Sequence, residues 1–445
     1  MSVSPARLTA FNILLRVSRY DSYAQELLHS EHCADLSPAD MGLTTELVMG
    51  VLRWQAALDS AIAKWAFQKI TKLDPEVLIA LRLGAYQLGW LDRIPTHAAI
   101  HESVELVKTA RKRSAGPFAN AILRRLSESR TQIKPDSINS ASTVTALANI
   151  SSHPQWIVHR WIARFGWDVA RKICQYDQRV PATTIRFRNC NVEERLQSEG
   201  VTLAPGQWLT SARRIMAGDI TATRASGENL VAIQDEASQL VAAMVGSGSR
   251  ILDCCAAPGG KTWAIADRNP RSLILAVELH HHRAHLLKKR VTAPNVLVVN
   301  SDARTLPTNS QFDRVLVDAP CSGTGTLARN PEIKWRLTTS DLADLSARQG
   351  ELLKSAMERV SPNGRLIYAT CSLESEEGEG VIESALRDNS AFRIASIGSI
   401  LQELVEQGEL VSENFTSLIH GEFLRTIPGI HDCDGFFAAV LERFR

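Results

Sequence analysis

Two cysteines in the C-terminal half of the chain occupy positions where chemistry could be done. Cys321 lies in DAPCSGTGT (residues 318–326), and Cys371 lies in ATCSL (residues 369–373). Each follows an apolar run and is therefore expected just past the end of a buried strand. Most buried cysteines are simply small apolar residues. Two of them at the ends of adjacent strands instead favour a reactive site, because a thiolate is a strong nucleophile.

A thiolate at this place could activate a poor nucleophile such as C5 of cytosine. Addition of sulfur to C6 makes an enamine whose C5 can attack the methyl group of a sulfonium. Loss of the C5 proton and departure of the thiolate then free the enzyme. The scheme requires a thiolate, an acid near cytosine N3 and a group that assists release. Cys371, Asp318 and Cys321 could supply these three functions.

A glycine turn ahead of the cysteines predicts a ligand site. ILDCCAAPGGKT (residues 251–262) reads as a buried strand, a tight turn and the start of a helix. Glycine lets the backbone approach a ligand and lets a helix N-terminus point at it. A Walker A loop would need glycine where Cys255 stands, and GxGxxG is absent. A nucleoside triphosphate and a dinucleotide are therefore both disfavoured.

Acids at the ends of three successive predicted strands favour a nucleoside without phosphate. These acids are Asp253, Glu278 and Asp302. Glu278 lies 25 residues beyond Asp253, near the spacing at which an acid takes ribose hydroxyls, and Asp302 could face the adenine edge. Each acid alone could equally be a helix N-cap, but together they favour a ligand. S-adenosylmethionine has the expected shape, with an adenosine, a sulfonium and an amino-acid end.

These residues follow an alternation of predicted strands and helices, which is typical of a doubly wound, Rossmann-like α/β sheet. A helical pattern covers residues 341–360, and residues 437–444 are expected to form an antiparallel edge strand. The parallel strand candidates are residues 250–255, 273–279, 295–302, 312–320 and 364–372.

The chain ahead of this region divides into three further parts, so we expect a multidomain protein. Residues 1–132 carry apolar side chains spaced by three and four, which predicts an all-α domain. Residues 133–152 read as a polar linker, residues 153–230 as a small α+β module with a strand at 183–189, and residues 231–445 as the α/β domain. Three tryptophans in the module could stack on RNA, but helix packing is favoured: Trp156, Trp161 and Trp167.

Composition restricts the class of protein further. The 445 residues include eight cysteines but no CxxC pair, so a disulfide framework and a thiolate zinc site are both disfavoured. No apolar run approaches the length of a membrane span, and no secretory leader is recognisable, which predicts a cytoplasmic protein with no membrane partner. No metal site is expected. The histidines at 280–282 and 285 are assigned to the first turn of a solvent-facing helix.

The net charge of +2 is unevenly distributed along the chain. Residues 1–135 carry an excess of +4, residues 136–230 carry +3, and the remainder carries −5. Basic side chains at 111–113 and 124–125 contribute to the first excess. A solvated helix face would explain these charges, but they also fit an N-terminal half that meets a polyanion.

Several strings in the N-terminal part resemble the NusB-like helical domain. They are ELVMGVLRW (46–54), ALRLGAYQLGWLDRIPTHAAI (80–100), ESVELVK (102–108) and FANAILRRL (118–126). That domain binds RNA in transcription antitermination and also stands at the front of one bacterial family of rRNA methyltransferases. The resemblance implies an RNA-binding role for residues 1–132, and residues 153–230 resemble the RRM-like module that precedes the catalytic domain in RNA cytosine-5 methyltransferases.

The C-terminal strings resemble the signature of that enzyme class, the Nop2/Sun family. AAPGGKT (256–262), DAPCSGTGT and ATCSL occur in the family's order. Cys321 stands in CSGTGT and not in the PCQ string of DNA cytosine methyltransferases, which favours the RNA class. The resemblance implies that Cys371 is the nucleophile, that Cys321 assists product release and that Asp318 contacts cytosine. It also implies S-adenosylmethionine as cofactor, held by Asp318 and by the following residues: Cys255, Ala256, Ala257, Pro258, Gly259, Gly260, Lys261, Glu278 and Asp302.

The resemblance implies a methyltransferase acting on cytosine C5 of small-subunit (16S) rRNA, and we expect a monomer. Two departures from the family pattern stand out. Glu278 replaces a common Asp, and the string after Cys371 reads Glu376-Glu377-Gly378-Glu379 where Glu-Glu-Asn-Glu is frequent. Two other functions stay open, namely a tRNA cytosine-5 methyltransferase and a noncatalytic RNA-binding factor with a vestigial methyltransferase fold. The intact cysteines argue against the second.

Overall fold

The computed structural model describes residues 3–20, 22–187, 191–308, 310–411 and 415–444. It divides into two compact units, one of Met1–Val180 with Leu327–Arg336, and one of Pro181–Thr326 with Leu337–Arg445. A compact unit can hold more than one domain, so the boundaries expected at 132, 152 and 230 stay predictions.

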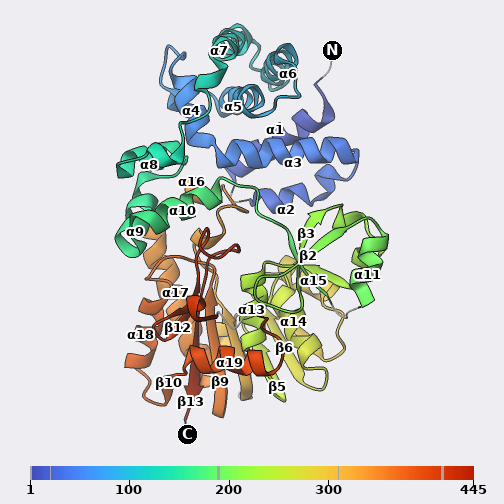
Figure 1. Cartoon of the computed structure of the whole chain (residues 1–445), viewed down its shortest axis with the longest axis vertical. Helices are drawn as coiled ribbons and strands as arrows, with labels where there is room; N and C mark the ends of the chain where they lie inside the picture. The colour runs from blue at the N-terminus through green and yellow to red at the C-terminus, as the bar shows by residue number, and fades with distance from the viewer. Residues whose placement is uncertain (1–2, 21, 188–190, 309, 412–414, 445) are drawn as a thin grey trace. The chain divides into compact units, whose positions relative to one another are not determined.

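The first unit is helical throughout its described residues, as predicted for the N-terminal part (Figure 1). Proline stands in the first turn of α1, α3, α5 and α7, where its missing N–H costs nothing. One apolar core joins α1 and α3 to α5, α6 and α7. The helices are α1 (Pro5–Arg19), α2 (Ala24–Leu28), α3 (Pro38–Arg53), α4 (Gln55–Ala63), α5 (Pro75–Trp90), α6 (Thr96–Thr109), α7 (Gly116–Glu128), α8 (Val144–Ile150), α9 (Gln155–Phe165), α10 (Trp167–Asp177) and α16 (Ile333–Arg336).

The helical unit also contains the three tryptophans and the predicted linker from the middle of the chain. Trp161 is 1% exposed, while Trp156 and Trp167 are half-buried, which agrees with the favoured helix packing. The predicted linker contains a short 3₁₀ helix, η5 (Ile138–Ser140), and α8.

Residues 327–336 return to the helical unit from the α/β part of the sequence. The Lys334 ammonium donates to the Arg53 carbonyl at 2.9 Å, and the Trp335 indole donates to the Leu52 carbonyl at 2.7 Å. Lys334 is 1% exposed. The sequence offered no sign of this placement, because the segment lies directly after a catalytic string and shows no apolar periodicity of its own.

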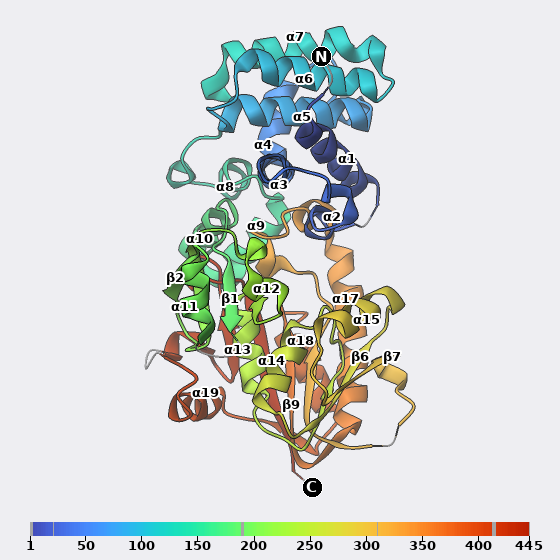
Figure 2. The ribbon, with the colours of Figure 1, turned by 90° about the vertical axis from the view of Figure 1, so that its right-hand side faces the viewer.

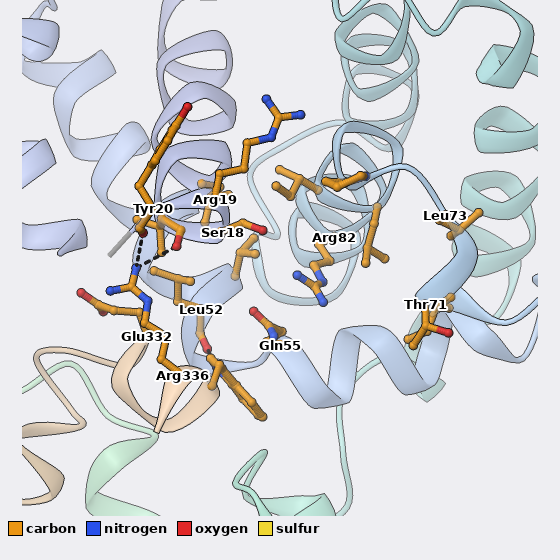
Figure 3. Close-up of a pocket in the computed structure, with 18 residues that line it drawn as sticks. Ser18, Arg19, Tyr20, Leu52, Gln55, Thr71, Leu73, Arg82, Glu332 and Arg336 are labelled. Atoms are coloured by element: carbon orange, nitrogen blue, oxygen red, sulfur yellow. Dashed lines mark hydrogen bonds between the residues drawn. The ribbon is translucent and has the colours of Figure 1, made fainter. Parts of the chain in front are cut away.

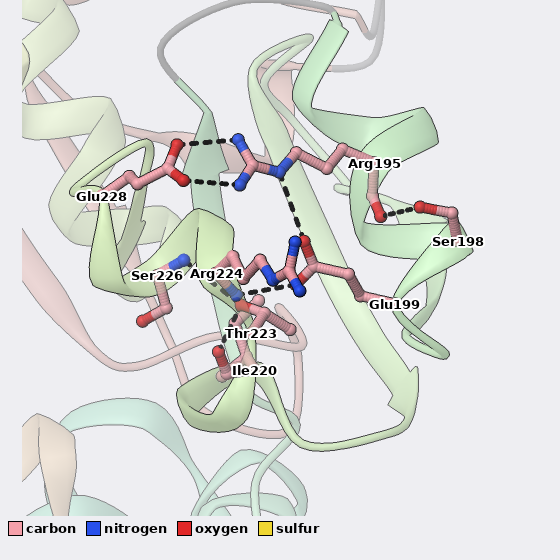
Figure 4. A network of polar contacts seen from close by, with 8 residues as sticks. All are labelled: Arg195, Ser198, Glu199, Ile220, Thr223, Arg224, Ser226 and Glu228. Atoms are coloured by element: carbon pink, nitrogen blue, oxygen red, sulfur yellow. Dashed lines mark hydrogen bonds and ion pairs between the residues drawn. The ribbon is translucent and has the colours of Figure 1, made fainter.

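The second unit begins with a small antiparallel sheet in the strand order β2-β3-β1-β4. Its strands are β1 (Thr184–Phe187), β2 (Thr202–Pro205), β3 (Ala212–Ala217) and β4 (Val231–Ile233). β1 matches the predicted strand at 183–189, whose last two residues lie outside the described part. Two helices lie between these strands in the sequence, α11 (Asn191–Ser198) and α12 (Arg224–Gly227). Arg195 of α11 donates twice at 2.7 Å to Glu228, which directly follows α12 (Figure 4).

A second, larger sheet follows, in the order β11-β12-β13-β9-β8-β5-β6-β7, with β10 pairing β13. The five strands from β5 to β9 are parallel and match the five candidates, so the doubly wound fold is confirmed. The strands are β5 (Arg250–Asp253), β6 (Leu273–Glu278), β7 (Val296–Asn300), β8 (Phe312–Asp318), β9 (Val360–Thr370), β10 (Phe392–Ile394), β11 (Ile419–His420), β12 (Phe423–Thr426) and β13 (Phe436–Arg443).

Helices cover both faces of this sheet (Figures 1 and 2). The core on one face joins the sheet to α13 (Glu236–Met244), α14 (Gly260–Arg268) and α19 (Ile397–Glu406), and α15 (His281–Arg290) lies beside β6 and β7. The core on the other face joins it to α17 (Thr339–Glu358) and α18 (Glu379–Arg387). Burial on both faces explains why the central strands read as continuous apolar runs.

The expectation of an edge strand at 437–444 was wrong. β13 is antiparallel to β9, as predicted, but it also pairs with β12 and β10 on its other side. Its first six residues are all buried. A strand buried along its length leaves backbone groups away from water, and these need partners on both sides. The short strands at 392–394 and 423–426 supply them.

Candidate active site

The two cysteines lie beside each other at the carboxyl ends of neighbouring strands. β8 and β9 are parallel, and Asp318 lies opposite Ala369 in their register. Cys321 follows β8 and Cys371 follows β9, so both side chains reach the same edge of the sheet. Their sulfur atoms are 3.1 Å apart. The sequence patterns therefore led to two thiols that can serve one bound substrate.

The loops that carry the cysteines are joined through their backbones. The N–H of Gly325, in the 3₁₀ turn η8 (Thr324–Thr326), donates to the Cys371 carbonyl at 3.0 Å. Leu373 N–H donates to the Thr324 hydroxyl at 2.9 Å. Glycine is required at 325, because an added Cβ would lie 2.1 Å from the Gly435 carbonyl oxygen. The spacing of the two loops is thus fixed by close backbone packing.

The surroundings of Cys321 favour its neutral form. Contact with the Cys371 sulfur, followed by burial, raises the pKa of the Cys321 thiol, and the Glu377 carboxylate adds to this effect. A thiol that keeps its proton is a poor nucleophile but can donate that proton at a reacting centre. The geometry therefore suits Cys321 to proton handling.

Asp318 ends β8 and forms an ion pair that faces the same region. The Lys261 ammonium donates to the Asp318 carboxylate at 2.8 Å, and it also lies 5.0 Å from the centre of the Phe436 ring. Lys261 comes from the first turn of α14, directly after the glycine turn. The pair joins the ligand turn to the loop of the cysteines.

A pocket lies over the glycine turn and includes Asp318. Gly259 adopts a φ of 109°, and a Cβ there would lie 2.8 Å from both Leu287 and Val291, so only glycine fits the turn. Three further residues, Ile233, Gln234 and Ser238, also line the pocket, although the sequence had not indicated them as site residues. The lining residues are Ile233, Gln234, Ser238, Asp253, Cys255, Ala256, Ala257, Pro258, Gly259, Gly260, Lys261 and Asp318.

Asp253 lies at the base of this pocket and is 1% exposed. One carboxylate oxygen accepts a hydrogen bond from the Thr262 hydroxyl at 2.7 Å, while the other has no well-aligned partner among the described residues. Burial raises the pKa of Asp253 to about 7, and the nearby Asp318 carboxylate acts in the same direction. An unsatisfied buried acceptor at this position suits a ligand that brings hydrogen-bond donors or a cationic group.

Glu278 and Asp302 lie at the ends of β6 and β7, but neither lines this pocket. Glu278 is 5% exposed, and its carboxylate accepts from the His280 N–H at 2.8 Å. Asp302 caps the 3₁₀ helix η7 (Ala303–Thr305) and pairs with Arg304 at 2.8 Å. The Arg304 guanidinium lowers the pKa of Asp302. Their roles toward a ligand stay predictions.

The histidines at 281, 282 and 285 are exposed on α15, as expected for a solvent-facing helix. Within the described ranges, no group of three or more His, Cys, Asp or Glu side chains is arranged to hold a metal ion. The same ranges contain no helix with the length and apolar character to cross a bilayer.

A pocket of about 420 Å³ in the helical unit has a different character (Figure 3). Two of its arginines are neutralised, Arg82 by Asp59 at 2.7 Å and Arg19 by Glu76. A third, Arg336, donates to the Val17 carbonyl at 2.8 Å. No cysteine lines this pocket, so the chemistry belongs to the sheet edge.

The parallel sheet, the glycine turn at its first strand and the strand-end acids define a Rossmann-like, S-adenosylmethionine-dependent methyltransferase. Residues 242–442 match the family described as 16S rRNA methyltransferase RsmB/F, and residues 4–128 match the NusB family. The chain belongs to the family of ribosomal RNA small subunit methyltransferase B, and its N-terminal domain is NusB-like.

Relatives of full length support this assignment. The probable ribosomal RNA small subunit methyltransferase B of Bacillus subtilis is 30% identical over all of both chains. Its counterpart in Synechocystis is 31% identical over 98% of this chain and 99% of its own. The crystal structure of PH0851 covers all of both chains with a TM-score of 0.80 at 24% identity, which shows a shared fold.

Proposed function

We propose that this protein methylates C5 of a cytosine in 16S rRNA through a covalent bond between Cys371 and C6. The observation that carries this proposal is the approach of the Cys371 and Cys321 sulfurs to 3.1 Å, beside Asp318 and the glycine-turn pocket. Addition to a pyrimidine ring and its reversal need a nucleophile and a proton-handling group at one carbon–carbon bond. The printed names of the relatives support small-subunit rRNA as substrate.

The first step belongs to Cys371. Its thiolate forms a bond to C6, and the electrons of the C5–C6 double bond move toward C5, which becomes nucleophilic. Asp318, held by Lys261 at 2.8 Å, accepts a hydrogen bond from the amino group beside N3 of cytosine and orients the ring. S-adenosylmethionine supplies the methyl group when bound, and the residues that would hold it are the glycine turn, Asp253 and, as predicted, Glu278 and Asp302.

The second step restores aromaticity and frees the enzyme. C5 carries both the new methyl group and its original proton, so a base must remove that proton while the bond between C6 and sulfur breaks. The Cys371 thiolate departs with the electron pair of that bond. We assign assistance in this release to Cys321, whose thiol keeps its proton and lies 3.1 Å from the Cys371 sulfur. It gives that proton to the departing sulfur and, as the thiolate so formed, takes up the proton from C5.

Replacement of the nucleophile tests this function. We expect Cys371→Ala to abolish methyl transfer to 16S rRNA, because no other group forms the bond at C6. The affinity for S-adenosylmethionine, measured by calorimetry, should stay within about twofold of the unaltered enzyme, a difference of less than about 0.5 kcal/mol in binding free energy. The product of the unaltered enzyme, digested to nucleosides, should contain 5-methylcytidine.

Cys433→Ala is the matched control. Cys433 is 2% exposed and does not line the pocket, so its loss should leave methyl transfer intact. Methylation by Cys371→Ala, or a methylated atom other than C5, would contradict the proposal. Preferential methylation of tRNA over 16S rRNA would retain the chemistry and reject the substrate.

A further inference from the structure

One buried carboxylate connects the loops of both cysteines. Glu377 lies two residues before α18 and is 0% exposed. Its Oε1 accepts from the Ser322 backbone N–H at 2.8 Å and from the Gln349 amide at 2.9 Å. Its Oε2 accepts from the Ser372 hydroxyl at 2.6 Å and from the Ser322 hydroxyl. A single side chain therefore accepts four hydrogen bonds.

The partners of this carboxylate are the residues that directly follow the thiols. Ser322 follows Cys321, and Ser372 follows Cys371. The two serine hydroxyls are also 3.1 Å from each other. Any change in the spacing of the two loops must break at least one of these bonds, so the contacts of Glu377 oppose movement of either sulfur.

The network also reaches the residue in front of Cys321. Gln349, on α17, donates to the Pro320 carbonyl at 2.9 Å as well as to Glu377. The Tyr368 hydroxyl, on β9, lies 2.8 Å from the Glu377 carbonyl oxygen and donates to it. Cys321 is thus held on both sides by groups that meet at Glu377.

We propose that Glu377 is a positioning residue that sets the distance between the two thiols by clamping Ser322 to Ser372. Its role in methyl transfer rests on the proposed function, whereas its effect on the distance between the two sulfurs does not depend on which reaction they perform. Among the described residues, the hydrogen bonds of this carboxylate go to the two serines and Gln349, and none goes to sulfur. Glu377 therefore acts through the loops and does not touch the substrate.

A carboxylate suits this position because it only accepts hydrogen bonds. Two of its donors, a backbone N–H and an amide, cannot reverse their direction, while the two hydroxyls can. Glutamine can keep one oxygen toward the fixed donors and turn its NH₂ toward the hydroxyls. Alanine leaves all four groups without their partner in a buried place, which is costly. The two substitutions consequently separate geometry from charge.

Disulfide formation in the full-length protein measures the clamp directly. Diamide oxidises two thiols to a disulfide and is itself reduced to the hydrazine, taking up two electrons and two protons. Peptide mass spectrometry then follows the Cys321–Cys371 bond over time. We expect Glu377→Ala to slow its formation by about tenfold or more, because misplacement of about 1 Å strongly reduces the rate of a proximity reaction, and Glu377→Gln to remain within about threefold of the unaltered protein.

Methyl transfer provides the second readout. Glu377→Ala should lower kcat, with S-adenosylmethionine affinity unchanged, and Glu377→Gln should restore most of kcat. Glu379→Ala is the matched control, because Glu379 begins α18 and pairs with the nearly buried Arg425 at 2.8 Å. It should lower stability without changing the rate of disulfide formation.

Specific results would overturn the clamp. They are an unchanged disulfide rate in Glu377→Ala, an equally slow rate in Glu379→Ala, or a Glu377→Gln variant as impaired as Glu377→Ala. If Glu377→Ala does not bind cofactor and has unfolded, Ser372→Ala decides the question: a slower disulfide supports the clamp, and an unchanged rate rejects it. Absence of 5-methylcytidine from the unaltered enzyme would defeat the proposed function while the disulfide rates still measured the clamp.

Discussion

The pair of thiols is asymmetric because its two members have different neighbours. Cys321 lies between Cys371 and the network around Glu377, and both neighbours raise its pKa. Asp318 instead faces a cation, Lys261, which holds it in place. A thiol that keeps its proton and an ion-paired carboxyl group thus lie near one point.

Asp302 was predicted to hold the cofactor, but in the structure its carboxylate already has partners within the protein. It caps a 3₁₀ helix and pairs with Arg304, yet it was predicted to contact the cofactor. If that contact exists, Asp302→Ala should weaken S-adenosylmethionine binding by roughly 1–3 kcal/mol in calorimetry, because a buried donor of the ligand loses its acceptor. Arg304→Gln removes the same ion pair but keeps the carboxylate, so it should bind normally. Equal losses in both variants would limit Asp302 to capping.

The loops beyond β8 and β9 depend on close packing of backbone. Gly325→Ala would place a methyl group 2.1 Å from the Gly435 carbonyl. We expect this variant to lose about 1–3 kcal/mol of unfolding free energy, because overpacking forces the backbone to shift. Its methyl transfer should also fall, because the same shift moves the backbone around Cys371.

Gly350→Ala is the control for this prediction. Gly350 lies inside α17 with nothing within 4 Å of an added Cβ. Alanine there should raise the unfolding free energy by about 0.5–1 kcal/mol and leave activity unchanged. A stable and active Gly325→Ala variant, measured by denaturant unfolding and methyl transfer, would contradict the packing account.

Patterns within single elements made much of this arrangement predictable. Apolar runs located β5 to β9, and the residues that end those runs located the glycine turn, Asp318 and both cysteines. The clamp was not predictable, because Glu377 stands in an acidic string that reads as an exposed helix start. Its burial depends on Ser322 and Gln349, which are 55 and 28 residues away. The inner position of β13 was not predictable for the same reason, because it depends on pairing with two short strands outside its own segment, β10 and β12.

At the scale of the whole chain, charge and chemistry are assigned to different parts of the sequence. The excess of +4 in residues 1–135 contrasts with −5 beyond residue 230. Arg111, Arg113 and Arg124 are exposed in the helical unit. We predict that these side chains contact RNA phosphates, since a NusB-like domain stands here.

Salt dependence of RNA affinity tests that prediction. Replacement of Arg111, Arg113 and Arg124 by Gln should reduce the slope of log affinity against log salt concentration by up to about 2–3. Each phosphate contact releases counterions on binding, so the loss of three contacts lowers the number released. The matched control replaces Arg195, Arg304 and Arg393, which are paired with carboxylates. An unchanged slope in the first variant would place the phosphate contacts elsewhere.

The central claim is that Cys371 bonds to cytosine and that Cys321 helps to break that bond. The most direct measurement is the amount of covalent protein–RNA complex formed by Cys321→Ala with 16S rRNA and S-adenosylmethionine, resolved on a denaturing gel. We predict a slowly migrating, nuclease-sensitive band, because attack proceeds while release stalls. The band should be absent when Cys371→Ala is added to the same protein. Normal turnover by Cys321→Ala without a trapped species, or a band that persists without Cys371, would contradict this account.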